Sequence, residues 1–202
     1  MLDRALTAWI RAPMEAAAQR LAGLGVSADA ITVAGFAVGL AGAVCIATGW
    51  FLVGLCAVLA SRLMDGLDGA VARLTQPTDR GAFLDITLDF LFYASIPLAF
   101  ALAAPTHNAL AAAVLLAAFI GTGTSFLAFA ALAERRGLKS QAYPNKGLYY
   151  LGGLTEASET LMCFVLMCLW PAQFALFAYG FAALCGLTLI GRLLAGWRAL
   201  RV

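Results

Sequence analysis

Apolar residues fill six stretches of the chain, and short breaks that contain glycine, proline or polar residues separate them. The six stretches are residues 30–49, 51–73, 82–103, 109–133, 147–169 and 172–196. An α-helix rises 1.5 Å per residue, so about 20 apolar residues cross a hydrocarbon core about 30 Å thick. Each stretch reaches that length. The pattern therefore predicts an all-α integral membrane protein with six transmembrane helices.

The first 22 residues follow a different pattern, in which arginines alternate with large apolar side chains. Arg4, Arg11 and Arg20 are interleaved with Leu2, Leu6, Trp9, Ile10 and Met14. Such a basic amphipathic segment is typical of a helix that lies in the headgroup plane, and it is unlike a cleavable signal peptide. We predict one membrane domain, residues 1–202, with an interfacial helix at 1–22 and a six-helix bundle at 30–196.

The composition supports the bilayer as the main solvent. The chain has 202 residues, of which 63% are hydrophobic and 12% charged, whereas soluble domains carry about 25% charged residues. The five cysteines all lie in apolar runs without C-x-x-C spacing, so we interpret them as packing residues. The single histidine, His107, follows Pro105 in a polar break, and we expect it in a loop.

Basic residues are distributed on one side of the predicted bundle. They fall at the N-terminus, in the second and fourth connections and at the C-terminus: Arg4, Arg11, Arg20, Arg73, Arg80, Arg135, Arg136, Lys139, Lys146, Arg198 and Arg201. The other three connections have none, and Arg62 and Arg192 lie within spans toward the same side. The positive-inside rule then predicts a multi-pass protein of the cell membrane with both termini cytoplasmic.

Four aspartates interrupt the second and third apolar stretches. Asp65 and Asp68 are three residues apart, and Asp85 and Asp89 are four apart. On a helix each spacing places both carboxylates on one face. The turn at residues 75–81 predicts that the two helices are antiparallel neighbours, so we expect all four carboxylates to converge near the cytoplasmic ends. Crowded carboxylates in a low dielectric need cations, and hard oxygen ligands suit Mg²⁺, Mn²⁺ or Ca²⁺, in a number sufficient for two ions.

The same residues form a motif that resembles the signature of the CDP-alcohol phosphotransferase family. The motif is Asp65-x-x-Asp68-Gly69-x-x-Ala72-Arg73, seven residues, then Gly81-x-x-x-Asp85-x-x-x-Asp89. The resemblance covers nearly the whole chain, because six spans after an interfacial helix are also similar to that family. It implies an enzyme that transfers a phosphatidyl-type group from a CDP-linked lipid, such as CDP-diacylglycerol, to an alcohol and releases CMP.

The resemblance also implies roles for individual residues. Asp65, Asp68 and Asp85 bind Mg²⁺ or Mn²⁺, and Asp89 lies near the metal and acts as the general base. Asp65 and Asp68 also belong to the expected CDP site, together with Thr32, Gly69, Ala72, Arg73 and Gly81. One departure is visible, because Ala28-Asp29 stands where members of the family often carry Pro-Asn.

Two segments are candidates for binding the acceptor alcohol. Arg135, Arg136, Lys139 and Lys146 suit a phosphorylated polyol such as glycerol 3-phosphate or inositol phosphate, although topology alone explains basic residues there. Glu156 and Glu159, expected inside the fifth span, suit an amino alcohol such as serine or choline, or serve as structural residues. We favour the phosphorylated polyol, because four basic residues offer the more specific complement.

Two alternatives of another class remain at this point. The acidic cluster is compatible with an ion or metal transporter, although the three uncharged connections on the far side argue against one. A catalytically idle scaffold that keeps the motif is the second, although the intact Asp89 disfavours it. We also expect a homodimer packed through small-residue faces such as GFAVGLAGA, residues 35–43. We expect no nucleic-acid partner.

Overall fold

Helices make up the regular structure of the protein. The computed structural model describes residues 2–137 and 153–201. Its elements are α1 (Leu2–Gly23), α2 (Ala28–Ala47), α3 (Phe51–Leu74), α4 (Asp79–Ala103), α5 (Pro105–Arg135), α6 (Ala157–Leu169), a short 3₁₀ helix η1 (Pro171–Gln173) and α7 (Phe174–Ala199). The predicted all-α class is therefore confirmed for these residues.

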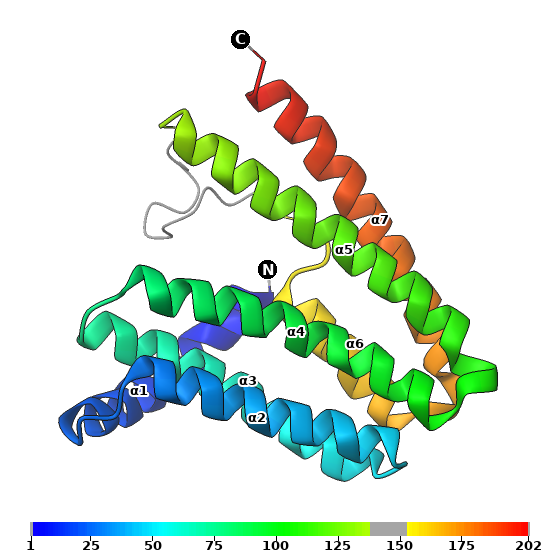
Figure 1. Ribbon diagram of the computed structural model, residues 1–202, viewed down its shortest axis with the longest axis horizontal. Helices are drawn as coiled ribbons and strands as arrows, with labels where there is room; N and C mark the ends of the chain where they lie inside the picture. The colour runs from blue at the N-terminus through cyan, green and yellow to red at the C-terminus, as the bar shows by residue number, and fades with distance from the viewer. Residues whose placement is uncertain (1, 138–152, 202) are drawn as a thin grey trace.

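The helices pack as two adjoining groups. In the first, α2 lies against α3 and α4, and α1 packs across α3; in the second, α5 lies along α7 and contacts α4 (Figure 1). α6 packs against both α3 and α7. Short connections make α2, α3 and α4 alternate in direction, so the start of α2, the end of α3 and the start of α4 share one end of the molecule.

Side-chain caps fix where α2 and α4 begin. The Ser27 hydroxyl accepts a hydrogen bond from the amide of Ala30 at 3.3 Å, and the Thr78 hydroxyl accepts one from the amide of Gly81 at 3.0 Å. Both residues are extended N-caps, the conformation that such caps adopt. Helix α4 therefore starts at Asp79, three residues before the predicted boundary at 82.

Four helices of the described part are long and apolar enough to cross a membrane. They are α2, α4, α5 and η1 with α7, the last counted as Pro171–Ala199. Helix α3 has 24 residues but carries the charged motif. Helix α6 has only 13 residues, which span about 20 Å. The predicted continuous span at 147–169 is wrong for residues 153–156, which precede α6 and are not helical.

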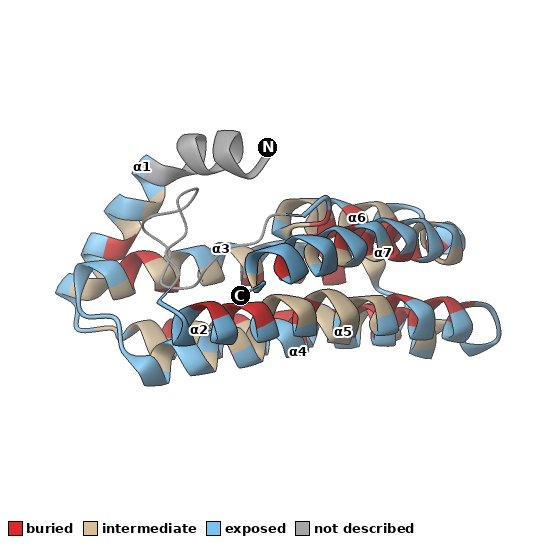
Figure 2. Ribbon diagram, turned by 90° about the horizontal axis from the view of Figure 1, so that it is seen from above, coloured by how far each residue is buried: buried red, intermediate tan, exposed pale blue. Residues whose placement is uncertain are grey.

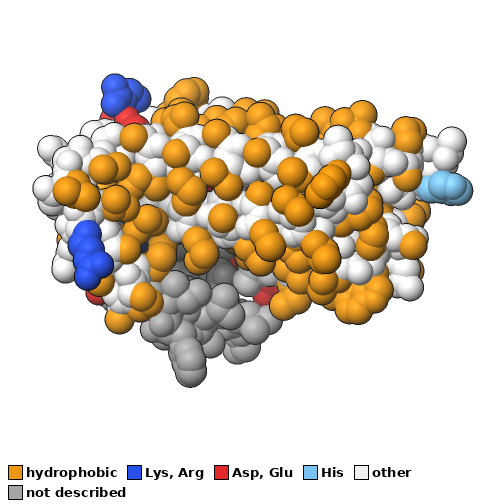
Figure 3. Space-filling model, turned by 90° about the horizontal axis from the view of Figure 1, so that it is seen from below, with side chains coloured by type: hydrophobic (Ala, Val, Ile, Leu, Met, Phe, Trp, Pro, Cys, Tyr) orange, Lys and Arg blue, Asp and Glu red, His pale blue; other side chains and the backbone are white. Residues whose placement is uncertain are grey.

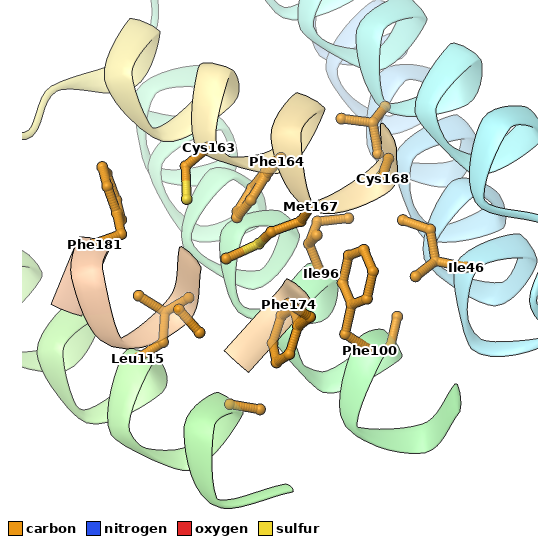
Figure 4. Packing of buried hydrophobic residues seen from close by; sticks show 14 of the residues in the cluster. Ile46, Ile96, Phe100, Leu115, Cys163, Phe164, Met167, Cys168, Phe174 and Phe181 are labelled. Carbon is orange, nitrogen blue, oxygen red and sulfur yellow. The ribbon is translucent and has the colours of Figure 1, made fainter. Parts of the chain in front are cut away.

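The main core lies where α4, α5, α6 and α7 meet the end of α2 and the start of α3. The Phe100 ring stacks between Phe174, with centroids 4.6 Å apart, and Phe51, at 5.7 Å. Cys163, Cys168 and Cys185 are buried in this cluster, which supports the packing role for these three, whereas Cys56 is exposed. Figure 4 shows Cys163, Met167 and Cys168 on the same helix, α6. Figure 2 shows the buried residues on the sides of the helices that face one another.

The outward faces of the helices are apolar. Phe83, Ile120 and Trp197 are each about two-thirds exposed or more, and hydrophobic side chains cover most of the face seen in Figure 3. On that face, lysine and arginine side chains gather at one end and the histidine lies at the other. Contiguous apolar surface of this extent needs lipid as its solvent, so the structure agrees with the membrane class.

His107 lies in a helix and not in the expected loop. It belongs to the first turn of α5, which begins at Pro105. Proline suits the first turn because its missing N–H has no helical partner to lose. The adjacent Asn108 is buried and donates a hydrogen bond to the Phe100 carbonyl at 2.9 Å, which ties the end of α4 to the start of α5.

The small-residue face of α2 packs inside the chain. A Cβ atom added at Gly39 would lie 2.6 Å from the Phe92 ring and 2.7 Å from the Ser61 hydroxyl, and one at Gly42 would lie 3.0 Å from Ala57. Gly35, Gly39 and Gly42 are all buried against α3 and α4. The glycines therefore bring α2 close to its intramolecular neighbours and are not available for an interface between two chains. The homodimer remains a prediction.

Candidate active site

A cavity lies between α2, α3 and α4, at the end of the molecule where α2 and α4 begin. Its lining comes from three helices: Thr32, Gly35 and Phe36 on α2, Ser61, Arg62, Asp65 and Asp68 on α3, and Asp85, Leu88 and Asp89 on α4. All four motif aspartates therefore face one cavity. The helical spacings of three and four residues account for this convergence, because each pair lies on one face of its helix.

The starts of α2 and α4 are held together beside this cavity. The Arg80 guanidinium donates to one Asp29 oxygen from both Nη2, at 2.6 Å, and Nε, at 3.1 Å. A Cβ atom at Gly81 would lie 2.9 Å from the other Asp29 oxygen. A larger residue at position 81 would therefore need the Asp29 side chain to shift. Asp29, which departs from the family pattern, therefore has a structural partner in Arg80, and the pair joins the start of α4 to the start of α2.

The four aspartates differ in exposure. The Asp65 and Asp89 side chains are 39% and 37% exposed, and Asp85 is exposed. Asp68 is 5% exposed, and its Oδ2 atom is buried without a hydrogen-bond partner. A buried carboxylate oxygen without a donor is costly unless a cation meets it. Asp68 therefore fits a divalent ion, and the all-oxygen donor set suits Mg²⁺ or Mn²⁺.

The carboxylates do not meet around a single point. Within residues 2–137 and 153–201, no three Asp, Glu, His or Cys side chains are placed closely enough to hold an ion. Arg62 lies between two of the aspartates: its Nη1 atom donates to Asp89 and lies 3.4 Å from Asp65. The structure thus confirms a shared cavity for the four aspartates, but it adds a cation that the spacing argument did not include.

Arg62 is the charged residue of the cavity that the sequence analysis did not predict as part of the site. The sequence indicated only that it lies within a span, toward the basic side. The signal was nevertheless present, because Arg62 stands one helical turn before Asp65 in an otherwise apolar run. An arginine inside a membrane helix generally faces the protein interior and pairs with an acid.

The remaining residues of the expected CDP site lie outside the cavity lining. Thr32 lines the cavity with the aspartates, but Gly69, Ala72, Arg73 and Gly81 do not. Arg73 folds back along its helix, because its Nη1 atom would lie 3.4 Å from a Cβ atom at Gly69. Gly69, Ala72 and Arg73 belong to the end of α3 beyond Asp68, and Gly81 belongs to the start of α4 before Asp85.

The basic acceptor candidates that the structure describes do not line the cavity. Arg135 is exposed in the last turn of α5. Arg136 donates a hydrogen bond to the Leu200 carbonyl at 2.8 Å, so it joins the end of α5 to the end of α7. Lys139 and Lys146 lie outside the described residues. Of the four basic candidates, Arg136 therefore bonds within the protein, and Arg135 is exposed to a ligand from outside.

Glu156 and Glu159 form the N-terminal cap of α6. Glu156 is the N-cap, and its backbone amide donates to the Glu159 carboxylate at 3.1 Å, in a reciprocal capping box. The Ser158 hydroxyl donates to the same carboxylate at 3.1 Å. Neither glutamate lines the aspartate cavity. This geometry favours the structural alternative for the two glutamates.

A polar contact joins the residues before α6 to α7. The Thr188 hydroxyl of α7 accepts hydrogen bonds from the amides of Leu154 and Thr155, both at 3.2 Å. The Thr155 hydroxyl lies 3.0 Å from it. These bonds hold residues 154 and 155 against α7 before α6 begins.

Comparisons with known proteins identify the family of the chain. The model of the CDP-alcohol phosphatidyltransferase family matches residues 26–191. Inner membrane protein YnjF of Escherichia coli (strain K12) is 51% identical over 201 residues, which are 100% of this chain and 98% of that protein. Archaetidylinositol phosphate synthase of Methanothermobacter thermautotrophicus is 43% identical over 83 residues, 41% of each chain.

Solved structures share the fold. The chain is similar to the phosphatidylinositol phosphate synthase PgsA1 of Mycobacterium tuberculosis in complex with manganese and citrate, with a TM-score of 0.73 and 24% identity over 91% of this chain and 88% of that one. The same enzyme with CDP-DAG bound matches with a TM-score of 0.71 and 23% identity over 91% and 93%.

Proposed function

This chain belongs to the CDP-alcohol phosphatidyltransferase family, and we propose that its reaction takes place in the aspartate cavity between α2, α3 and α4. The reaction transfers a phosphatidyl-type group from CDP-diacylglycerol, or a related CDP-lipid, to an alcohol in phospholipid biosynthesis. The observation that carries the proposal is the convergence of Asp65, Asp68, Asp85 and Asp89 on one cavity. Membership of a transferase family disfavours the transporter alternative.

Asp65, Asp68 and Asp85 hold the divalent metal in this proposal, with Asp89 close by. The buried, unpartnered Oδ2 of Asp68 is the feature of the structure that supports a cation here. The relative PgsA1 was crystallised with manganese, so Mn²⁺ and Mg²⁺ are the two candidates, in a site for two ions. When bound, the metal supplies charge that polarises the pyrophosphate and stabilises CMP as it leaves.

The residues of the chain perform the remaining steps. Thr32, Gly69, Ala72, Arg73 and Gly81 bind the CDP group between the cavity and the basic end of the molecule. Asp89 accepts the proton of the alcohol hydroxyl. The alcohol oxygen then forms a bond to the phosphorus that carries the diacylglycerol, and the bond from that phosphorus to the bridging oxygen breaks. CMP departs with that oxygen and its electron pair.

The direction of the helices supports a topology with six spans. Helices α3 and α6 complete the alternation between α2 and α7, so the ends that carry Arg73, Arg80, Arg135 and Arg198 lie on one side. By the positive-inside rule this side, with both termini and the cavity, is cytoplasmic. The E. coli relative is named an inner membrane protein. Helix α1 lies in the headgroup plane, and the homodimer is part of the proposal.

A phosphorylated polyol is the proposed acceptor. The archaeal relative and the mycobacterial structures are both named as synthases of inositol phosphate lipids. Arg135 is exposed and available for a phosphate, whereas Glu156 and Glu159 are engaged in the cap of α6. These observations favour glycerol 3-phosphate or inositol phosphate over serine or choline.

Release of CMP by the purified protein tests the reaction. The full chain is supplied with CDP-diacylglycerol and Mn²⁺ or Mg²⁺, and glycerol 3-phosphate, inositol phosphate, inositol, serine and choline are compared as acceptors. We expect release that depends on one phosphorylated acceptor and stops when a chelator removes the metal. Release that persists in excess chelator would contradict the metal site. Release with serine or choline alone would contradict the acceptor class.

Arg135→Ala tests the acceptor site once the acceptor is identified. A charge-assisted hydrogen bond contributes about 1.5–3 kcal/mol, so we expect the KM for a phosphorylated acceptor to rise about 10-fold or more with little change in kcat. Arg198→Ala removes an exposed arginine from the last turn of α7 and serves as the matched control. Equal KM values for both variants and the wild type would assign Arg135 a topological role only.

A further inference from the structure

Arg62 is the one basic residue among the described residues that line the aspartate cavity. Its side chain is 12% exposed, although it lies in an apolar helix of a membrane protein. Burying an unpaired arginine in a membrane helix is costly, so the contacts that stabilise Arg62 indicate what its role is. They fall into two groups, an aromatic platform on one side and two carboxylates on another.

The aromatic platform fixes the guanidinium from the core side. Its Cζ atom lies 3.8 Å from the centroid of the Phe92 ring and 5.4 Å from that of Tyr93. Phe92 is fully buried, and Gly39 of α2 packs so closely on it that a Cβ atom would lie 2.6 Å from the ring. Tyr93 in turn packs on Phe164 of α6, with centroids 6.0 Å apart. The cation therefore rests on rigid core side chains.

The two carboxylates belong to different helices. The Nη1 atom of Arg62 donates to Asp89 of α4 and lies 3.4 Å from the Asp65 carboxylate of α3. The Nη2 atom lies 3.5 Å from the Ser61 hydroxyl. Arg62 thus joins the residue proposed as the base to a residue proposed as a metal ligand. It bonds one oxygen of Asp89, a residue that also lines the cavity.

We propose that Arg62 is a positioning residue and a fixed counter-cation of the active site, clamped on Phe92 and Tyr93 so that it orients the Asp89 carboxylate and balances part of the aspartate charge. The inference rests on the proposed function, since it takes the aspartates as base and metal ligands. It separates the four carboxylates into two kinds. Asp89 is held by the guanidinium, and Asp68, whose Oδ2 has no partner, is left to the divalent ion.

The proposal gives a definite sign for metal binding. Arg62 and a divalent ion both neutralise the same carboxylates, so the two cations repel each other and compete for Asp65. Without Arg62, the site in chelator keeps its negative charge uncompensated. The ion should then contribute more to the stability of the fold than it does in the wild type. An arginine that only fills space would leave the stabilisation by metal unchanged.

Arg62→Met in the purified full chain tests this sign by thermal unfolding with Mn²⁺ alone as the probe. In chelator we expect the Tm to fall by about 5–15 °C, because a buried ion pair loses one partner. Saturating Mn²⁺ should restore more than half of that loss, so the Mn²⁺-induced rise in Tm exceeds that of the wild type. A rise no larger than that of the wild type overturns the counter-cation role.

Arg62→Lys tests the positioning role and protects the experiment if the Met variant does not fold. Lysine keeps the charge but not the planar fork that stacks on Phe92 and bonds Asp89. We expect an Mn²⁺-induced rise in Tm close to that of the wild type. We also expect a kcat lower by about 10- to 100-fold with the KM for CDP-lipid little changed, since a misplaced base costs rate and not binding. A kcat like that of the wild type overturns the positioning role.

Arg192→Met is the matched control for the thermal measurements. Arg192 is a second part-buried arginine, on α7, which donates to the Thr122 carbonyl at 2.9 Å and lies 5.7 Å from the Phe126 ring centroid. It does not line the aspartate cavity. We expect the Mn²⁺-induced rise in Tm to match that of the wild type. If the wild type itself shows no rise, the proposed metal site fails, which is distinct from a failure of the inference on Arg62 alone.

Discussion

We expect Asp89→Asn to lower the rate of CMP release by about 10²- to 10⁴-fold, the usual contribution of a general base, while the affinity for CDP-diacylglycerol stays close to that of the wild type. Asparagine keeps the shape of the side chain but cannot accept the proton of the alcohol. Asp89 lies in the cavity lining on α4, whereas the proposed CDP site extends toward the end of α3 and the start of α4. The loss therefore concerns turnover and not binding of the lipid substrate.

Single-turnover kinetics and lipid binding on the same preparation check this prediction. Asp79→Asn is the matched control, because Asp79 is an exposed aspartate in the first turn of α4, outside the cavity lining. We expect its turnover to equal that of the wild type. Turnover by Asp89→Asn within a factor of about three of the wild type would remove Asp89 as the base.

We expect Asp68→Asn to change activity and stability in opposite directions. Asp68 is 5% exposed, and one of its carboxylate oxygens is buried without a hydrogen-bond partner, so in chelator that oxygen carries uncompensated charge. The neutral amide costs less to bury. We expect the Tm in chelator to equal or exceed that of the wild type, the Mn²⁺-induced rise in Tm to shrink, and CMP release to fall by 10²-fold or more.

Thermal unfolding with and without Mn²⁺, together with a CMP assay, measures all three quantities. The expected change in Tm in chelator is opposite in sign to that for Arg62→Met. The two variants therefore distinguish Asp68, whose cation is the metal ion, from Asp89, whose cation is Arg62. An Asp68→Asn protein that is less stable in chelator, yet gains as much from Mn²⁺ as the wild type, would exclude Asp68 as a metal ligand.

The sequence predicted the elements of the fold well where the pattern is local. Five of the six predicted apolar stretches correspond to α2, α3, α4, α5 and η1 with α7, with boundaries that differ by a few residues. The boundaries moved where caps decide them. Thr78 starts α4 early, and Pro105 brings His107 into a helix, because an N-cap or a proline acts on the backbone independently of hydropathy.

The prediction failed where polar residues had two possible uses. Residues 153–156 read as part of an apolar span, but Thr188 binds the amides of Leu154 and Thr155, and Glu156 caps the helix that follows. Glu156 and Glu159, which form this cap, were also candidates for binding the acceptor alcohol. A short sequence does not reveal whether a glutamate faces a ligand or its own helix end, since both uses require only a carboxylate at the right spacing.

The sequence by itself determined the membrane class, the helical bundle and the pairing of the four aspartates, since hydropathy and the period of 3.6 residues are properties of each helix alone. Only the tertiary structure decided which cation stands among those aspartates. Gly39 of α2 packs closely against the Phe92 ring, and the Arg62 guanidinium lies over that ring. Because α4 lies antiparallel to α3, Arg62 then reaches Asp89. That contact joins residues 27 positions apart, and it depends on how three helices pack rather than on the pattern within any one of them.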